Sequence, residues 1–178
     1  IGGGTPTTLT ASQLNRLLDV LGRSLDLSGC LEYTVEAGRP DTITADKLAV
    51  LQSHGVTRIS VNPQTMNQKT LDIIGRRHTV EDIRKAFADA RELGFDNINM
   101  DLIVGLPGEG IEEVEHTMQE VLSLDPDSIT VHSLAIKRAA RLRMQKEQYE
   151  NLHIENTAQT IDLTAECCHE MGLEPYYL

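Results

Sequence analysis

A run of three glycines, Gly2–Gly4, is the first stretch of this sequence that could do chemistry. At the end of a β-strand it would expose backbone N–H and C=O groups that a small molecule can approach closely. The chain leaves the glycines through Thr5-Pro6-Thr7-Thr8, in which the proline restricts the backbone. A helical pattern follows, with Thr10 or Ser12 as N-cap. Short glycine motifs alone are weak signals and often belong to flexible leaders. The order strand, glycine turn, helix favours a binding loop.

Other polar or glycine-rich residues fall where further strands are predicted to end. They are Glu36, Asn62 to Gln64, Asp101 to Gly108, and His132 to Ala135. In parallel α/β proteins, ligands bind at the C-terminal ends of the strands. One acidic residue there could simply pair with an arginine such as Arg58, but consecutive strand ends of the same kind predict a ligand site.

Hydrophobic periodicity predicts the elements that position these residues, and it indicates about five or six strand–helix units. The predicted strands are Cys30–Ala37, Val56–Asn62, Asn97–Val104 and Ser128–Ile136. The predicted helices are Thr10–Leu27, Thr44–Ser53, Asn67–Gly75, Val80–Leu93, Ile111–Leu124 and Glu155–Met171. Every second strand residue is polar, which favours a barrel or half-barrel whose polar inner face holds a ligand. An antiparallel sheet with one wet face is the alternative.

Composition narrows the class of protein. The net charge of −11 disfavours a nucleic-acid surface, because contact with phosphates needs clustered Lys and Arg; the stretch Lys137 to Lys146 is the exception. No apolar run could span a bilayer and no secretory leader is present, so we expect a cytoplasmic protein without a membrane partner. Cys30, Cys167 and Cys168 have no metal-cluster spacing and suit reduced, buried thiols.

Five segments in fixed order carry a resemblance to a known family. They are Gly2-Gly3-Gly4-Thr5-Pro6-Thr7, Val35-Glu36-Ala37, Arg58-Ile59-Ser60-Val61 followed by Gln64, Ile74-Gly75-Arg76-Arg77-His78, and Met100-Asp101-Leu102-Ile103-Val104-Gly105-Leu106-Pro107-Gly108. Together they resemble the radical S-adenosylmethionine (SAM) enzymes of the oxygen-independent coproporphyrinogen III oxidase family. The segment Glu36 to Asp41 is similar to the coproporphyrinogen dehydrogenase branch of Gram-positive bacteria.

The resemblance implies an α/β fold, a partial (β/α)6 TIM-like barrel with parallel strands and outer helices. It implies that residues 1–178 are a single radical SAM core domain fragment, truncated at both ends, that binds SAM against a [4Fe-4S] cluster. The backbone of Gly2, Gly3, Gly4 and Thr5, together with Glu36, would bind the amino group of the methionine moiety. Arg76 would bind its carboxylate, Gln64 and Asp101 the ribose hydroxyls, and backbone near Ala135 the adenine.

The resemblance also implies a reaction. In the family, one electron from the cluster cleaves SAM to a 5′-deoxyadenosyl radical, which abstracts hydrogen from two porphyrinogen propionates that then lose their carboxyl groups and become vinyls. Such an enzyme needs a porphyrinogen or other small-molecule substrate and an electron donor. The family's Cys-x3-Cys-x2-Cys loop is missing here. We therefore expect cluster ligands upstream of Ile1, an absent C-terminal substrate region, an inactive isolated fragment, and neither metal ligands nor catalytic residues within this sequence.

Two alternatives stay open. Haem-binding chaperones of the same family keep the glycine motif and the barrel without decarboxylating porphyrinogens. A barrel lyase that binds a phosphorylated sugar at Gly105 to Gly110 is a third interpretation, but Lys47, Lys69 and Lys85 fall on predicted helices and leave it without an obvious catalytic lysine. His132 could be an ordinary lumen histidine, and Lys137 to Lys146 a solvated segment.

Overall fold

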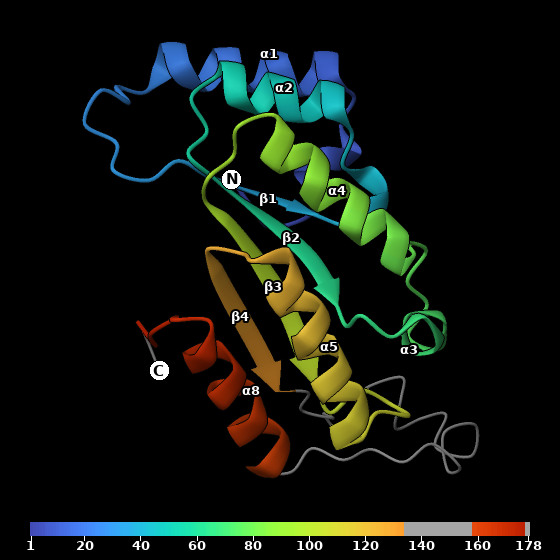
Figure 1. Ribbon diagram of the computed structural model, residues 1–178. Coiled ribbons are helices and arrows are strands. Elements are labelled where there is room, and N and C mark those ends of the chain that lie inside the picture. The colour runs from blue at the N-terminus through green and yellow to red at the C-terminus, as the bar shows by residue number, and fades with distance from the viewer. Residues whose placement is uncertain (134–157, 177–178) are drawn as a thin grey trace. The chain divides into compact units, whose positions relative to one another are not determined.

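The computed structural model describes residues 1–133 and 158–176, in which helices and strands alternate. The strands are β1 Thr34–Gly38, β2 Arg58–Gln64, β3 Ile98–Val104 and β4 Ser128–Ser133. The helices are η1 Pro6–Thr8, α1 Ala11–Ser24, η2 Pro40–Thr42, α2 Ala45–Ser53, α3 Gln68–Ile73, α4 Val80–Glu92, α5 Ile111–Leu124 and α8 Ala158–Glu170. The strands lie parallel in the order β1-β2-β3-β4 (Figure 1). The predicted parallel α/β class is confirmed.

The chain divides into two compact units. The first consists of Ile1–Pro63, His78–Asp101 and Pro126–Ser128. In it, α1 packs on α2, and α2 packs on α4. The apolar faces of these helices contribute a largely aliphatic set of buried side chains to the core, namely Leu14, Leu18, Leu48, Leu51, Ile83 and Phe87. This aliphatic core agrees with the low aromatic content of the sequence.

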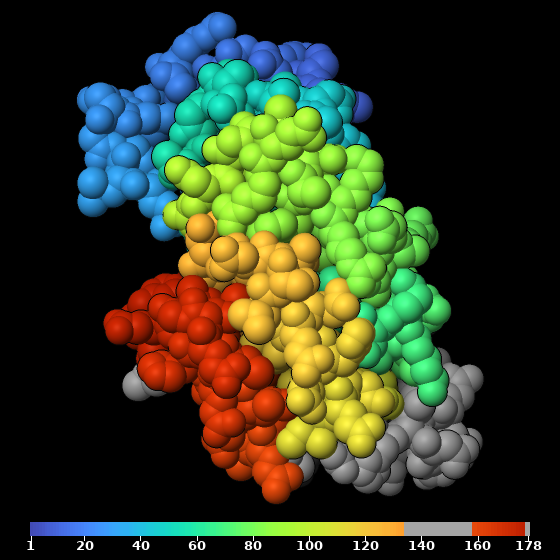
Figure 2. Space-filling model, in the orientation of Figure 1, coloured from blue at the N-terminus to red at the C-terminus, as the bar shows by residue number. Residues whose placement is uncertain are grey.

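The second unit consists of Gln64–Arg77, Leu102–Asp125 and Ile129–Leu178. Here α5 packs against α8, and the two helices lie side by side (Figures 1 and 2). Helix α5 buries Val114, Met118 and Val121 along one face, as its helical spacing predicts.

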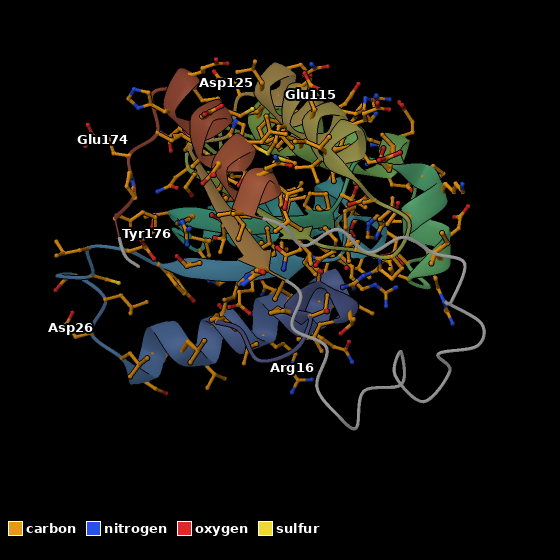
Figure 3. The ribbon with its side chains drawn as sticks, turned by 90° about the horizontal axis from the view of Figure 1, so that it is seen from below. Arg16, Asp26, Glu115, Asp125, Glu174 and Tyr176 are labelled. Carbon is orange, nitrogen blue, oxygen red and sulfur yellow. The ribbon has the colours of Figure 1, made fainter. Side chains whose placement is uncertain are left out.

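Local signals in the sequence explain where helices begin. Thr10 caps α1 in a capping box with Gln13, and Thr79 caps α4 in the same way with Asp82. Charged side chains away from the buried faces project outward, as Arg16, Asp26 and Glu115 do in Figure 3. Among the described helices, none is long and apolar enough to cross a membrane.

The start of β1 differs from the prediction. The structure begins this strand at Thr34 instead of Cys30, because its partner β2 begins at Arg58 and the parallel register places Thr34 opposite Arg58. The carbonyl oxygen of Tyr33, just before the strand, still accepts hydrogen bonds from the N–H groups of Thr57 and Arg58, but Leu31 is fully exposed. Cys30 is exposed too, which corrects the expectation that this thiol is buried.

Some predictions lie outside the described residues. They concern Ala135, the basic stretch Lys137 to Lys146, and the first turn of the helix predicted from Glu155.

Candidate functional site

The residue before the three glycines, Ile1, is hydrogen-bonded to the edge of β1 like a strand residue. The N-terminal ammonium of Ile1 donates to Thr34 O (2.6 Å), and the backbone N–H of Glu36 donates to Ile1 O (2.9 Å). A residue that bonds both neighbours of the residue opposite it is paired in the parallel manner, so Ile1 lies opposite Val35. The glycines follow at once, and Gly3 adopts a left-handed φ of 88°. The predicted order of strand position, glycine turn and helix is present.

Glu36 lies directly beside these glycines. Its Oε2 accepts a hydrogen bond from the backbone N–H of Gly3 (3.4 Å). A Cβ atom on Gly2 would overlap the Glu36 carboxylate, so this close approach requires glycine at position 2. The glycines and Glu36 are all exposed. This arrangement, which we call the glycine corner (Ile1–Thr5 with Glu36), presents a carboxylate and bare backbone to solvent.

Lys47, which the sequence analysis did not select as a site residue, hydrogen-bonds the segment that follows the glycines. The Nζ of Lys47 donates to the carbonyl oxygens of Thr7 (2.6 Å) and Thr42 (2.9 Å). The Thr7 hydroxyl donates to Ala37 O and lies 2.6 Å from the Thr42 hydroxyl. These bonds tie η1 to the end of β1. Lys47 comes from α2, as predicted, and its ammonium holds backbone carbonyls.

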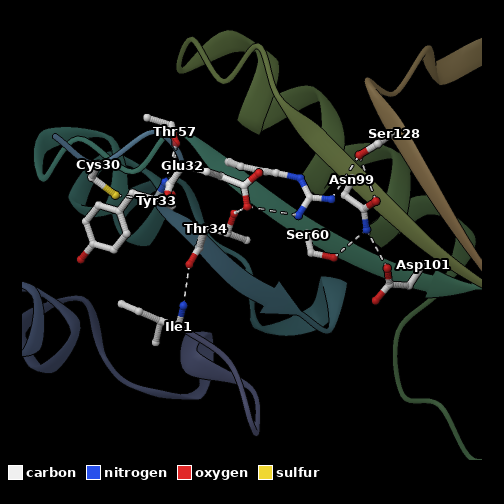
Figure 4. Close-up of polar contacts among 11 residues, drawn as sticks. Ile1, Cys30, Glu32, Tyr33, Thr34, Thr57, Ser60, Asn99, Asp101 and Ser128 are labelled. Atoms are coloured by element: carbon white, nitrogen blue, oxygen red, sulfur yellow. Dashed lines mark hydrogen bonds and ion pairs between the residues drawn. The ribbon is translucent and has the colours of Figure 1, made fainter. Parts of the chain in front are cut away.

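Asp101 belongs to a polar network on the strands of the first unit (Figure 4). The Asn99 side-chain amide donates to Asp101 Oδ1 (2.6 Å) and to Ser60 Oγ (3.1 Å). Ser60 in turn donates to Asn62 Oδ1 (2.8 Å). Asn99 and Ser60 are buried, whereas Asp101 is half-buried. The network therefore orients Asp101 through neutral groups and leaves its carboxylate partly accessible.

Arg58 closes the other end of this network. Its guanidinium lies 4.0 Å from Glu32 Oε1 and donates to Ser128 Oγ (3.3 Å), which donates to Asn99 Oδ1 (3.0 Å). The ion-pair partner of Arg58 is thus Glu32, which precedes β1. Glu36 and Asp101 are the two acidic site candidates, and neither forms this ion pair.

The second unit carries Gln64 and Arg76. Gln64 ends β2, is buried, and adopts a left-handed φ of 72° that non-glycine residues rarely take. Arg76 follows α3 and is half-buried; its N–H donates to Leu71 O (2.9 Å). His132 is exposed near the end of β4. The roles of these residues remain predictions.

A buried acidic residue in the loop after β3 escaped sequence reasoning. Glu109 is only 2% exposed, and its Oε1 accepts hydrogen bonds from Thr65 (2.6 Å) and Asn67 (3.1 Å). Burial raises the pKa of Glu109, and the nearby charge of Glu113 acts in the same direction. The sequence places Glu109 in the loop Gly105 to Gly110 and gives no sign that its side chain is buried.

Metal ligation has no support within the described ranges 1–133 and 158–176. These residues contain no group of three or more His, Cys, Asp or Glu side chains that could hold a metal ion. All three cysteines are free; Cys167 and Cys168 are half-buried on α8.

Comparisons with known proteins show which family the chain belongs to. The Radical SAM superfamily model matches residues 1–121. The chain is 46% identical over 178 residues to the oxygen-independent coproporphyrinogen-III oxidase-like protein HemZ of Bacillus subtilis, covering 99% of this chain and 36% of HemZ. It is 44% identical over 138 residues to the heme chaperone HemW of the same organism, covering 77% of this chain and 36% of HemW.

A solved structure supports the same assignment. Coproporphyrinogen III oxidase HemN from Escherichia coli, a radical SAM enzyme, matches with a TM-score of 0.80 and 30% identity, over 96% of this chain and 39% of HemN. The chain thus spans about a third of the length of the curated relatives it matches, and its fold is part of a TIM-like barrel. The chain belongs to the radical SAM superfamily, among the relatives of oxygen-independent coproporphyrinogen III oxidase.

Proposed function

We propose that this chain is the SAM-binding core of an oxygen-independent coproporphyrinogen III oxidase-like enzyme of haem biosynthesis. The full-length protein would oxidatively decarboxylate two propionates of a porphyrinogen to vinyl groups. The identity to HemZ over nearly the whole chain supports this choice. The observation that carries the SAM-binding part is the exposed Glu36 carboxylate beside the bare backbone of Gly2 and Gly3.

The glycine corner fits the amino group of the methionine moiety. An ammonium has only donors, so it requires acceptors, and Glu36 with the backbone carbonyls of the glycine corner offers them. Because any side chain at Gly2 would displace the Glu36 carboxylate, the corner keeps this acceptor in place only with glycine there.

The remaining contacts follow from the chemistry of each group. The Arg76 guanidinium would hold the methionine carboxylate as a bidentate partner. Gln64 and Asp101 would bind the ribose hydroxyls, and backbone near Ala135 the adenine. When bound beside a reduced [4Fe-4S] cluster, SAM supplies the radical that abstracts hydrogen from the substrate. This chain's own residues would bind and orient SAM.

The cluster itself does not fit the residues present. Within the part of the chain that the structure describes, no set of side chains could ligate it. We propose that its cysteine ligands lie in a segment of the full-length protein outside this sequence, and that an external donor reduces it.

A haem chaperone is the second candidate. It is favoured by the 44% identity to HemW of Bacillus subtilis, which is close to the identity with HemZ but covers less of the chain. A chaperone of this kind would bind haem without removing carboxyl groups from porphyrinogens.

One experiment separates the two candidates. The full-length protein, with its cluster reconstituted without oxygen, is given SAM, a reductant and coproporphyrinogen III, and the products are followed by mass spectrometry. The proposal predicts 5′-deoxyadenosine together with loss of two carboxyl groups from the porphyrinogen. Deoxyadenosine without decarboxylation would contradict the substrate, and bound haem with neither product would favour the chaperone.

A further inference from the structure

Glu109 is the centre of a buried polar group in the second unit that the proposed function has not used. We call Thr65, Asn67, Glu109 and Thr117 the Glu109 cluster. The Thr117 hydroxyl on α5 lies 3.1 Å from that of Thr65 and accepts from the Asn67 amide (3.0 Å). Asn67 also donates to Glu113 O (2.9 Å). Three separate segments, the turn after β2, the loop after β3 and helix α5, are therefore joined in one hydrogen-bonded group.

Burial of the Glu109 carboxylate in this cluster costs free energy. Burying a carboxylate is unfavourable unless neighbouring groups hydrogen-bond to it. The raised pKa of Glu109 shows that the hydrogen bonds from Thr65, Thr70 and Asn67 only partly offset its burial. Apolar side chains in place of Glu109 and its polar partners together would avoid that cost, so the carboxylate is expected to fix a particular backbone arrangement.

The backbone that it fixes is the turn directly after Gln64. The amide N–H of Met66 donates to the Thr117 hydroxyl (3.1 Å), and that of Asn67 donates to the Thr65 hydroxyl (3.2 Å). Gln64 itself has a φ of 72°, in the left-handed region. For a residue other than glycine this backbone conformation is unfavourable, and it persists only where the surrounding structure imposes it.

We propose that Glu109 is a positioning residue for SAM binding: through Thr65 and Asn67 it holds the turn after β2 so that Gln64 keeps its left-handed backbone and presents its side chain to the ribose hydroxyls. This proposal rests on the proposed function of Gln64. Glu109 makes no contact with the ligand and acts only through the turn.

A double-mutant cycle in the full-length protein tests the coupling. SAM affinity is measured by calorimetry for Glu109→Ala, Gln64→Ala and the double variant. Glu109→Ala is expected to weaken binding about tenfold when Gln64 is present and to have no further effect when it is absent, because residues that act through one another are not additive. Equal effects in both backgrounds, or no effect in either, would overturn the proposal.

Two further variants separate positioning from general stability. Glu109→Gln keeps an Oε1 acceptor for Thr65 and Asn67, so it should restore most of the affinity lost in Glu109→Ala. Val121→Ala truncates a buried side chain of α5 that is outside the cluster, so it should destabilise the protein and leave SAM affinity unchanged. A loss of affinity in Val121→Ala as large as that in Glu109→Ala would contradict positioning.

A measurement without SAM keeps the two proposals apart. Hydrogen exchange of the Met66 and Asn67 amides should accelerate in Glu109→Ala by more than the loss of global stability explains, whereas in Val121→Ala it should accelerate no more than that loss explains. Unchanged exchange in Glu109→Ala would overturn the positioning role. Faster exchange together with a wild-type protein that does not bind SAM would support the hold on the turn and contradict the proposed function instead.

Discussion

The glycine corner and the Glu109 cluster each contain one carboxylate beside a glycine-rich segment, but they treat it in opposite ways. In the glycine corner, Glu36 is exposed and receives a long hydrogen bond from the N–H of Gly3. In the cluster, Glu109 is 2% exposed and is bonded by Thr65 and Asn67. The Glu36 carboxylate can therefore still accept hydrogen bonds from a ligand, whereas the Glu109 carboxylate accepts its hydrogen bonds from the protein.

This difference predicts that the two carboxylates have different roles, Glu36 in ligand binding and Glu109 in the stability of the fold. Removing an exposed acceptor should cost affinity and little stability, because solvent replaces its partner. Removal of a buried acceptor leaves neighbouring donors unsatisfied, which lowers the free energy of unfolding. Variants of the two carboxylates should therefore affect different measurements.

The largest effect on folding is expected for Glu109→Ala. Buried donors on Thr65 and Asn67 would lose their acceptor, so the free energy of unfolding should fall by about 3 kcal/mol. Glu36→Ala at the exposed corner should change it by less than about 0.5 kcal/mol. Urea unfolding followed by circular dichroism measures both, and equal losses would erase the contrast.

A smaller effect, on affinity, is expected for Gly2→Val. The added side chain would push the Glu36 carboxylate out of the corner, so SAM binding by the full-length protein should weaken about tenfold or more, the loss of one charged hydrogen bond. Gly22→Ala on α1, where a Cβ meets no atom within 4 Å, is the matched control and should bind normally. Calorimetry that finds wild-type affinity in Gly2→Val would contradict the role of the corner.

Lys47→Met should have a moderate effect on stability. It removes the ammonium that bonds Thr7 O and Thr42 O, so we expect a loss of about 1 to 2 kcal/mol of unfolding free energy. Lys85→Met on α4 is the control: its exposed pair with Asp89 is worth only about 0.5 kcal/mol. If thermal unfolding shows the same small shift for both, Lys47 does not fasten the glycine segment.

The smallest effect is a pH dependence of stability. Because burial raises the pKa of Glu109 above its ordinary value of 4.5, the folded chain holds more protons than the unfolded chain between that value and the raised one. The free energy of unfolding should therefore fall as pH rises through this window. Unfolding at a series of pH values should show a weaker fall in Glu109→Gln.

Asp41→Asn provides the control for that series. Hydrogen bonding to Arg39 lowers the pKa of Asp41, so this group loses its stabilising effect only as pH falls below its ordinary value of 3.8. The slope above pH 4.5 should be the same in Asp41→Asn as in the wild type. A wild-type slope in Glu109→Gln would contradict the assignment of this window to Glu109.

The two regions also differ in how far sequence alone reveals them. Apolar spacing predicted the bounds of α5 to the residue, and the glycine motif pointed to the corner with Glu36. These signals are local. The predicted start of β1 was wrong, because the register with β2, and not the sequence of β1, decides where strand pairing begins.

The Glu109 cluster could not be predicted for a related reason. Glu109 and Thr65 are 44 residues apart, and only the folded chain shows that this acidic residue is buried among hydroxyl and amide donors. Lys47 was assigned correctly to a helix, yet its bonds to Thr7 and Thr42 depend on tertiary packing.

The central claim is that the exposed carboxylate of Glu36 binds the amino group of SAM. The most direct test compares SAM affinity by calorimetry for Glu36→Gln and Glu32→Gln in the full-length protein with its cluster reconstituted. Glu32 is an exposed acidic residue that pairs with Arg58 outside the glycine corner. We predict a loss of about tenfold or more for Glu36→Gln and no change for Glu32→Gln. Equal affinities of Glu36→Gln and the wild-type protein would contradict the account.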